Sequence, residues 1–76
     1  MSTLYVMTRS HSDEGEMYDE AVAVYDTRQG VDDDCMVLNT AVDDGDVALL
    51  QAMDPGYDPS MVGVCYTFNQ AVYRRK

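Results

Sequence analysis

The sequence is poor in histidine, cysteine and basic residues. Among 76 residues there are one histidine, two cysteines and no tryptophan, and five basic residues stand against 14 acidic ones, for a formal net charge of −9. A chain of this length has room for one small domain, which buries roughly 60–65% of the surface that its unfolded chain exposes. Size therefore excludes a two-domain enzyme, a dinucleotide-binding unit with a substrate domain, and a barrel.

Long hydrophobic runs are also absent. The longest unbroken apolar stretches have four or five residues, such as Ala21 to Tyr25, whereas a membrane-spanning helix needs about 20. The N-terminal segment lacks the charged stretch followed by an apolar stretch that is typical of a secretion signal. We therefore expect a cytoplasmic protein without membrane contact. Hydrophobic residues make up 46% of the chain, which is ordinary for a folded domain, so the acidity does not require disorder.

The cysteines and the histidine do not form a recognisable site. Cys35 and Cys65 each lie in an apolar run, and we expect both to be buried free thiols, because nothing signals the oxidising compartment that a disulfide needs. His11 lies in a polar stretch typical of a solvated loop. With one histidine and no Cys-x-x-Cys pair, neither a zinc site nor a Cys–His catalytic pair is expected. We therefore predict that the protein is not an enzyme.

Two aspartate clusters raise the question of calcium. An EF-hand loop needs oxygen ligands at its first, third and fifth positions and glycine at its sixth. A loop starting at Asp43 places Gly45 third and Val47 fifth, and a loop starting at Asp32 places Val37 sixth. Both fail the pattern, so we expect no metal and no cofactor.

The charge is concentrated in one part of the chain. All 14 acids lie between Asp13 and Asp58, and over residues 10–60 the only base is Arg28, a net of −13. Such a field repels phosphate backbones and anionic lipid, so direct binding of nucleic acid or membrane is not expected. A basic protein is the natural partner, and its association would be steered electrostatically and weakened by salt.

The first half of the chain contains one clear strand and one ambiguous segment. Thr3 to Arg9 is β-prone and free of Gly and Pro, which predicts a strand. From Asp13 to Gly30 the apolar spacing favours a helix that ends at Gly30. The alternative is a strand centred on the β-branched run Ala21 to Tyr25.

In the second half, Asp32 to Asp34 is expected to form a charged turn, followed by a buried strand at Cys35–Val42, with a helix as the alternative. Residues 43–46 form a turn that can cap a helix at Val47–Met53, which residues 54–56 end. Met61–Tyr73 alternates like a strand, with core-facing residues expected at Val62, Val64, Tyr66 and Phe68.

These elements predict a single α+β domain over residues 1–76. It would hold an antiparallel or mixed sheet of about three strands with one or two short helices. The basic residues within 73–76 form a tail that we expect to be frayed or folded back on the acidic body.

The pattern of charge predicts a non-enzymatic inhibitor or adaptor. Same-face carboxylates lie about 6.6 Å apart on a strand, so they can meet Arg and Lys side chains arranged for a nucleic acid. The protein would mimic nucleic-acid charge and bind a basic, nucleic-acid-binding protein, and small acidic products of phages and plasmids have this general profile. The candidate contact residues are the clustered acids and an aromatic anchor in the proline-rich loop: Asp13, Glu14, Glu16, Asp19, Glu20, Asp32, Asp33, Asp34, Asp43, Asp44, Asp46 and Tyr57.

The alternative is a small structural or regulatory domain whose acidity serves solubility or adaptation to high salt. Such a domain would bind a partner or a second copy of itself through an apolar face rather than a charged one. Methionine suits adaptable surfaces, so the candidates for that face are Met7, Met17, Met36, Met53 and Met61.

Overall fold

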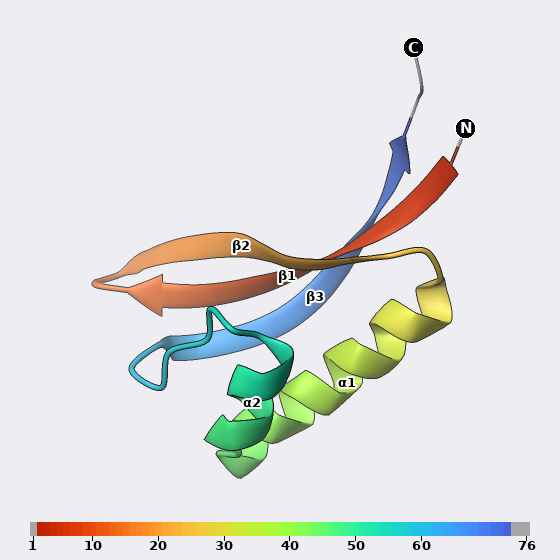
Figure 1. Cartoon of the computed structure of the whole chain (residues 1–76). Helices are drawn as coiled ribbons and strands as arrows, with labels where there is room; N and C mark the ends of the chain where they lie inside the picture. The colour runs from red at the N-terminus through yellow and green to blue at the C-terminus, as the bar shows by residue number, and fades with distance from the viewer. Residues whose placement is uncertain (1, 74–76) are drawn as a thin grey trace.

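The chain folds into a three-stranded antiparallel sheet with two helices against one face (Figure 1). The computed structural model describes residues 2–73. The elements follow in the order β1 (Ser2–Asp13), β2 (Glu16–Tyr25), α1 (Arg28–Asp44), α2 (Val47–Met53) and β3 (Val62–Tyr73). The strand order in the sheet is β2-β1-β3, so the first strand lies in the centre. This confirms the predicted small α+β domain.

The predicted helix within residues 13–30 is wrong, because Glu16–Tyr25 is the edge strand β2. The chain reverses at Glu14 and Gly15, whose φ angles are 51° and 84°. Positive φ at both central residues is the geometry of a tight hairpin turn, and it brings β2 alongside β1. The gain from pairing along β1 outweighs the local helical spacing of the segment.

The predicted turn at Asp32 to Asp34 and strand at Cys35–Val42 are also wrong, because both segments belong to α1. Thr27 caps the helix by accepting a hydrogen bond from the Gly30 amide at 3.2 Å. Gly45, with φ 70°, ends it in the left-handed conformation that favours glycine. The buried residues of the helix recur every three or four positions: Val31, Cys35, Leu38 and Ala41.

The helix at Val47–Met53 and the last strand are confirmed. Asp46 caps α2 through its side chain, which accepts from the Leu49 amide at 3.2 Å. In β3 the residues Val64 and Phe68 pack against the core. Val62 does not, and it is 65% exposed, because the strand register shifts between Ser10 and Ser12 opposite it. The end of the predicted basic tail, residues 74–76, lies outside the described residues.

The core lies between the sheet and the helices. Its buried apolar residues are Met7, Val31, Cys35, Leu38, Ala41, Leu50 and Tyr66. Cys35 is buried as predicted, but the prediction for Cys65 is wrong, because that residue is exposed on the opposite face of the sheet. Neither helix in residues 2–73 is long and apolar enough to cross a membrane.

A buried ion pair joins the central strand to the end of α2. Arg9 and Asp54 are 1% and 2% exposed, and Nη1 of Arg9 donates to Oδ2 of Asp54 at 2.5 Å. The Tyr66 hydroxyl donates to the same oxygen at 2.8 Å, and the Gly56 amide donates to Oδ1 at 3.2 Å. Nη2 of Arg9 reaches outward to the exposed Glu20. One carboxylate therefore fastens β1, β3 and the loop after α2 together.

The pKa shifts follow this arrangement. Burial by itself would lower the pKa of the Arg9 guanidinium, but the hydrogen bond and the negative charge of Asp54 outweigh burial, so the pKa lies above its usual value. Burial raises the pKa of the Tyr66 hydroxyl, and its hydrogen bond to Asp54 raises it further. Both groups thus keep their protons and remain donors to Asp54.

A second polar contact ties α1 to β3. The Asn39 side chain accepts from the Tyr66 amide at 2.8 Å and donates to the Tyr66 carbonyl at 2.9 Å. These two groups lie on the outer edge of β3, where no further strand pairs within the described chain. Asn39 thereby substitutes for a neighbouring strand at the middle of an open sheet edge.

We predict that breaking the buried pair is costly. Arg9→Met or Asp54→Leu alone should lower the free energy of unfolding by about 3–5 kcal/mol, because each leaves a buried charge without its buried partner. The double variant should lose less than the sum of the two, because neither charge remains. Urea denaturation measures all three. The control is Glu20→Gln, which removes the exposed partner of the same arginine and should cost less than about 1 kcal/mol. Equal costs for Asp54→Leu and Glu20→Gln would contradict the assignment.

We also predict that Asn39→Ala lowers the free energy of unfolding by about 1–3 kcal/mol, because it leaves two backbone groups of Tyr66 without a partner. The matched control is Gln51→Ala on the exposed side of α2, which should change it by less than about 0.5 kcal/mol. Thermal unfolding of the two variants side by side provides the comparison, and similar melting temperatures would contradict the role of Asn39.

Candidate functional site

Eight of the twelve predicted contact residues fall into three places on the molecule. Asp13, Glu14 and Glu16 are exposed at the turn between β1 and β2. The cluster at residues 32–34 lies in the N-terminal half of α1. Asp43 and Asp44 lie at the other end of that helix, next to the start of α2. The hairpin turn and α1 are separate elements, so the acids do not form one continuous patch.

Several of the predicted contact residues are already engaged within the fold. Asp19 accepts from the Ser10 hydroxyl at 2.6 Å, and Glu20 pairs with Arg9. Asp46 caps α2. These three carboxylates have structural partners, which makes them less available to another protein.

Asp34 is also engaged, because it accepts a hydrogen bond from the Tyr25 hydroxyl at 2.5 Å. Burial, together with this hydrogen bond, raises the pKa of Tyr25 to about 12. The contact joins the end of β2 to the first half of α1. Of the three consecutive aspartates, only Asp32 and Asp33 are therefore fully turned to solvent.

The outward side of α1 combines free acids with exposed apolar residues. We define the α1 outer face by the solvent-facing residues of the helix: Asp32, Asp33, Met36, Val37, Thr40, Asp43 and Asp44. Met36 and Val37 are 65% and 42% exposed. Asp33 and Asp44 are about 16 Å apart along the axis, from the rise per residue. An apolar centre thus lies between two acidic ends.

No base within residues 2–73 forms an ion pair with this face. Every ion pair in the described part of the chain involves Arg9, which is buried on the other side of the helix layer. The single side-chain contact to Asp33 is from the neutral Gln29 amide, at 2.8 Å. The carboxylates at both ends therefore retain their negative charge for a partner.

A groove beside α1 extends the apolar centre toward β3. It has a volume of about 470 Å³ and is lined by Asp32, Cys35, Met36, Asn39, Tyr66, Thr67 and Phe68. Asp32 and Met36 belong both to this groove and to the α1 outer face. An apolar side chain of a partner can enter the groove while a basic neighbour meets Asp32.

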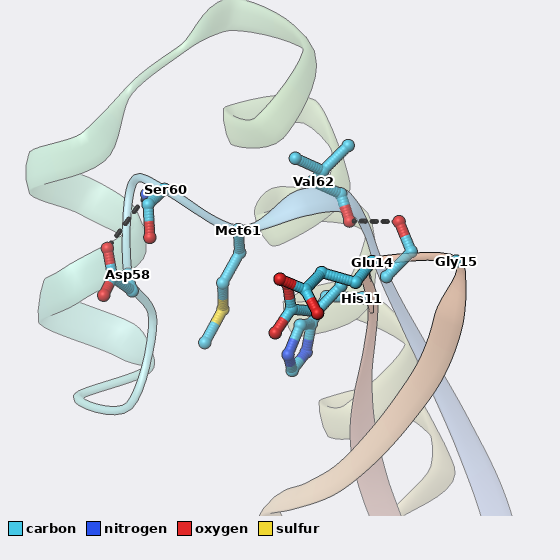
Figure 2. Close-up of a pocket in the computed structure, with 9 residues that line it drawn as sticks. His11, Glu14, Gly15, Asp58, Ser60, Met61 and Val62 are labelled. Atoms are coloured by element: carbon cyan, nitrogen blue, oxygen red, sulfur yellow. Dashed lines mark hydrogen bonds between the residues drawn. The ribbon is translucent and has the colours of Figure 1, made fainter.

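A second cleft, of about 480 Å³, lies between the hairpin turn and the loop before β3 (Figure 2). Its walls carry Asp13, Glu14 and Asp58, and the side chains of Met61 and His11 enter it from the β3 side and the β1 side (Figure 2). A hydrogen bond from the Ser60 amide lowers the pKa of Asp58. This cleft is acidic but holds no apolar floor comparable to the α1 groove.

The position of His11 differs from its prediction. It was expected in a solvated loop, but it lies in β1, because the strand extends to Asp13 rather than ending at Arg9. Its ring stacks on Tyr18 with centroids 5.6 Å apart, and its Nδ1 is buried without a hydrogen-bond partner among the described residues.

Tyr57, predicted as an aromatic anchor, lies in the loop after α2. Its side chain is half-buried and packs against the core cluster. Its amide donates to the Asp54 carbonyl at 3.0 Å. The Tyr57 ring therefore helps to cover the core. Less of its surface is accessible to a partner than in a fully exposed aromatic side chain.

The environment of Cys35 does not activate its thiol. Burial, and then the nearby charges of Asp32 and Asp34, raise the pKa of the Cys35 thiol, which is the opposite of what a reactive thiolate needs. Within residues 2–73, no three His, Cys, Asp or Glu side chains are placed to hold a metal ion. What the surface provides is charge and apolar area, which are the components of a protein-binding site.

Two features were missed from the sequence, the buried pair of Arg9 and Asp54 and the α1 outer face. The roles of Arg9 and Asp54 depend on a contact across 45 residues, which no local pattern shows. The α1 outer face was missed because the segment was predicted as a turn and a strand. One signal was present: Val31, Cys35 and Leu38 follow helical spacing once the reading window begins before the aspartates.

No protein-family model matches the chain, and the searches of curated proteins and of solved structures found no match. The geometry of the molecule therefore carries the functional argument by itself.

The Tyr25–Asp34 contact predicts a loss of stability at high pH. In the unfolded chain Tyr25 ionises near pH 10, whereas in the fold its pKa is about 12. Its contribution to the free energy of unfolding is fully present below pH 10 and is lost as the pH rises through about 12. Urea unfolding at a series of pH values should show a shallower decline for Tyr25→Phe than for the unaltered protein. Parallel declines would contradict the assignment.

Proposed function

We propose that this protein is a non-enzymatic inhibitor or adaptor that binds a basic, nucleic-acid-binding protein by mimicking nucleic-acid charge. The observation that carries the proposal is the α1 outer face, where aspartates without an ion pair in the described part of the chain lie at both ends of an exposed apolar centre. The acidic hairpin turn provides a secondary contact on the same molecule.

The apolar centre accounts for affinity. Met36 and Val37 project from a helix whose other side is firmly packed, so they present apolar area at little cost in ordering the backbone. Protein interfaces commonly have an apolar centre surrounded by polar residues that exclude water. A partner with an apolar patch ringed by Arg and Lys is complementary to this face.

The acidic ends account for the class of partner. Carboxylates placed close together without bases repel one another and weaken the fold. Arg and Lys side chains arranged to contact phosphates would relieve that repulsion by pairing with Asp32, Asp33, Asp43 and Asp44. The formal net charge of −9 also disfavours a nucleic acid as the partner itself, so the complementary molecule is the protein that binds one.

The test uses the immobilised protein and a lysate of its host, with elution at low and high salt and identification by mass spectrometry. We expect recovery of a basic nucleic-acid-binding protein that high salt releases. With that partner purified, an added nucleic-acid oligonucleotide should displace it from the immobilised protein, because the two compete for the same basic surface. A partner that salt does not release and nucleic acid does not displace would overturn the proposal.

Variants locate the contact. Asp32→Lys with Asp33→Lys should weaken binding at least tenfold, because each change replaces an attraction with a repulsion worth about 1 kcal/mol or more. The melting temperature should be unchanged or higher, since both side chains are exposed. The comparison is Asp13→Lys with Glu16→Lys at the hairpin turn, the secondary contact, which changes the net charge equally and should weaken binding less. Equal losses in both pairs would indicate non-specific attraction rather than a site on α1.

A further inference from the structure

The outer edge of β3 is open beyond Tyr66. The amide and the carbonyl of Tyr66 point away from β1, because both are hydrogen-bonded to the Asn39 side chain. In an antiparallel pair every second residue points its backbone groups in the same direction, so those of Phe68 and Gln70 also point outward. Within residues 2–73 no further strand pairs with them, because β3 is the last strand of the sheet. Such an edge is a template for a strand of another chain.

The groove of about 470 Å³ between α1 and β3 lies next to this edge (Figure 1). Phe68, in its lining, is held in place, because it packs against the core and its ring meets the Tyr5 ring edge to face with centroids 6.4 Å apart. On the helix side the groove presents the exposed side chains of Met36 and Asp32. A strand added beside Phe68 therefore has an apolar and acidic wall along one of its faces.

We propose that the outer edge of β3 binds an extended basic segment of the partner protein, which adds to the sheet as a strand antiparallel to β3. This deepens the proposed function and rests on it for the class of partner. Hydrogen bonds to the backbone of Phe68 and Gln70 provide affinity, and side chains at alternate positions provide specificity. Nucleic-acid-binding proteins commonly carry such segments, because runs of like charge stay unfolded and form binding arms.

The geometry specifies the side chains of the added strand. Directly opposed residues of an antiparallel pair have their side chains on the same face of the sheet. Phe68 packs against the core, so the residues opposite Phe68 and Gln70 direct their side chains to the helix side. Alternate residues of a strand are about 6.6 Å apart, and Asp32 and Met36 are one turn, about 6 Å, apart along α1. An apolar and a basic residue two positions apart can therefore meet both side chains.

Charge determines which segment fits. Within residues 2–73 no base forms an ion pair with Asp32, and β3 contains no charged residue, so the complement of the groove is a basic side chain. An acidic segment would be repelled by the same carboxylate. Pairing of this edge with a second copy of the chain is opposed by the net charge of −9 on each copy.

Three capped nine-residue peptides of equal charge test the added strand. In the first, valine and arginine alternate at the even positions and threonine fills the odd ones. The second has two N-methylated amides at even positions, which face β3 in the antiparallel arrangement, and the third has two at odd positions, which face away. Calorimetry should show binding at least about tenfold weaker for the second peptide and little changed for the third. No binding of the first peptide, or equal affinity for all three, would overturn the proposal.

Amide hydrogen exchange locates the added strand on the protein. The first peptide should slow exchange at the amides of Phe68 and Gln70, because both become hydrogen-bonded. The Thr67 amide is the internal control, since it points toward β1 and should change little. Slower exchange along the outer edge of β2, with no change at Phe68 and Gln70, would contradict the assignment.

A pair of variants tests the preference for a basic segment. Asp32→Asn should weaken binding of the first peptide by about threefold or more, because it removes the carboxylate from the groove. The matched control is Asp58→Asn in the loop before β3, which removes the same charge and should change the affinity by less than about twofold. Equal losses would show that net charge, rather than the groove, attracts the peptide.

This inference and the proposed function fail in different experiments. If a basic partner that salt releases is recovered from the lysate but the peptides do not bind as expected, the strand on β3 is wrong and the proposed function stands. If the peptides bind as expected but no basic nucleic-acid-binding protein is recovered, the edge binds basic segments and the proposed function is wrong.

Discussion

The buried pair between Arg9 and Asp54 is the interaction on which the rest of the structure depends. A domain of this size has a core of only seven buried apolar residues, and the pair lies beside it at the junction of β1, β3 and the loop after α2. Burying an ion pair has a high desolvation cost, so this pair contributes mainly by fixing the geometry of the fold. The Tyr66 hydroxyl, the Gly56 amide and the Arg9 guanidinium all donate to Asp54 and require its carboxylate at one position. That requirement fixes the position of the end of α2 relative to β1 and β3.

The same pair decides which charges face the solvent. In the described part of the chain Arg9 forms ion pairs with two carboxylates, Asp54 and Glu20, and no other ion pair is present there. Asp19, Asp34 and Asp46 are held by neutral donors, and so are Glu16 and Asp33, which accept from the Tyr18 hydroxyl and the Gln29 amide. The other acids of α1 and of the hairpin turn have no such partner among the described residues, and their mutual repulsion weakens the fold. The proposed binding role accounts for acids that stability does not.

The sequence predicted the elements whose patterns are purely local. The Asp46-capped helix and the last strand have clear ends in the sequence, and the central strand was recognised although its end was placed at Arg9 rather than Asp13. The α+β class follows from these three elements. The middle of the chain was predicted wrongly because its local patterns conflict with its tertiary contacts. The apolar residues of 16–25 have a helical spacing, but the segment gains more hydrogen bonds and packing by pairing with β1. The aspartates before Cys35 have the composition of a turn but lie within α1.

The prediction of the candidate site was incomplete for the same reason. The acids of α1 were identified from charge alone, yet their arrangement around Met36 and Val37 depends on the helix, and the engagement of Asp34 depends on Tyr25 from another element. The ion pair of Arg9 and Asp54 spans 45 residues, and the two side chains have no distinguishing neighbours in the sequence. Contacts of that range emerge only when the strands are in register.

The central claim is that the fold is held by its core and its buried pair, so that the acidic surface is available for a partner. Its most direct test is the free energy of unfolding in urea, measured from very low salt to molar KCl. The account predicts a cooperative unfolding transition at low salt and a modest, saturating gain as salt screens the surface carboxylates. A chain that is unfolded at low salt and folds only in molar KCl would contradict it, because the acids would then be an adaptation to salt.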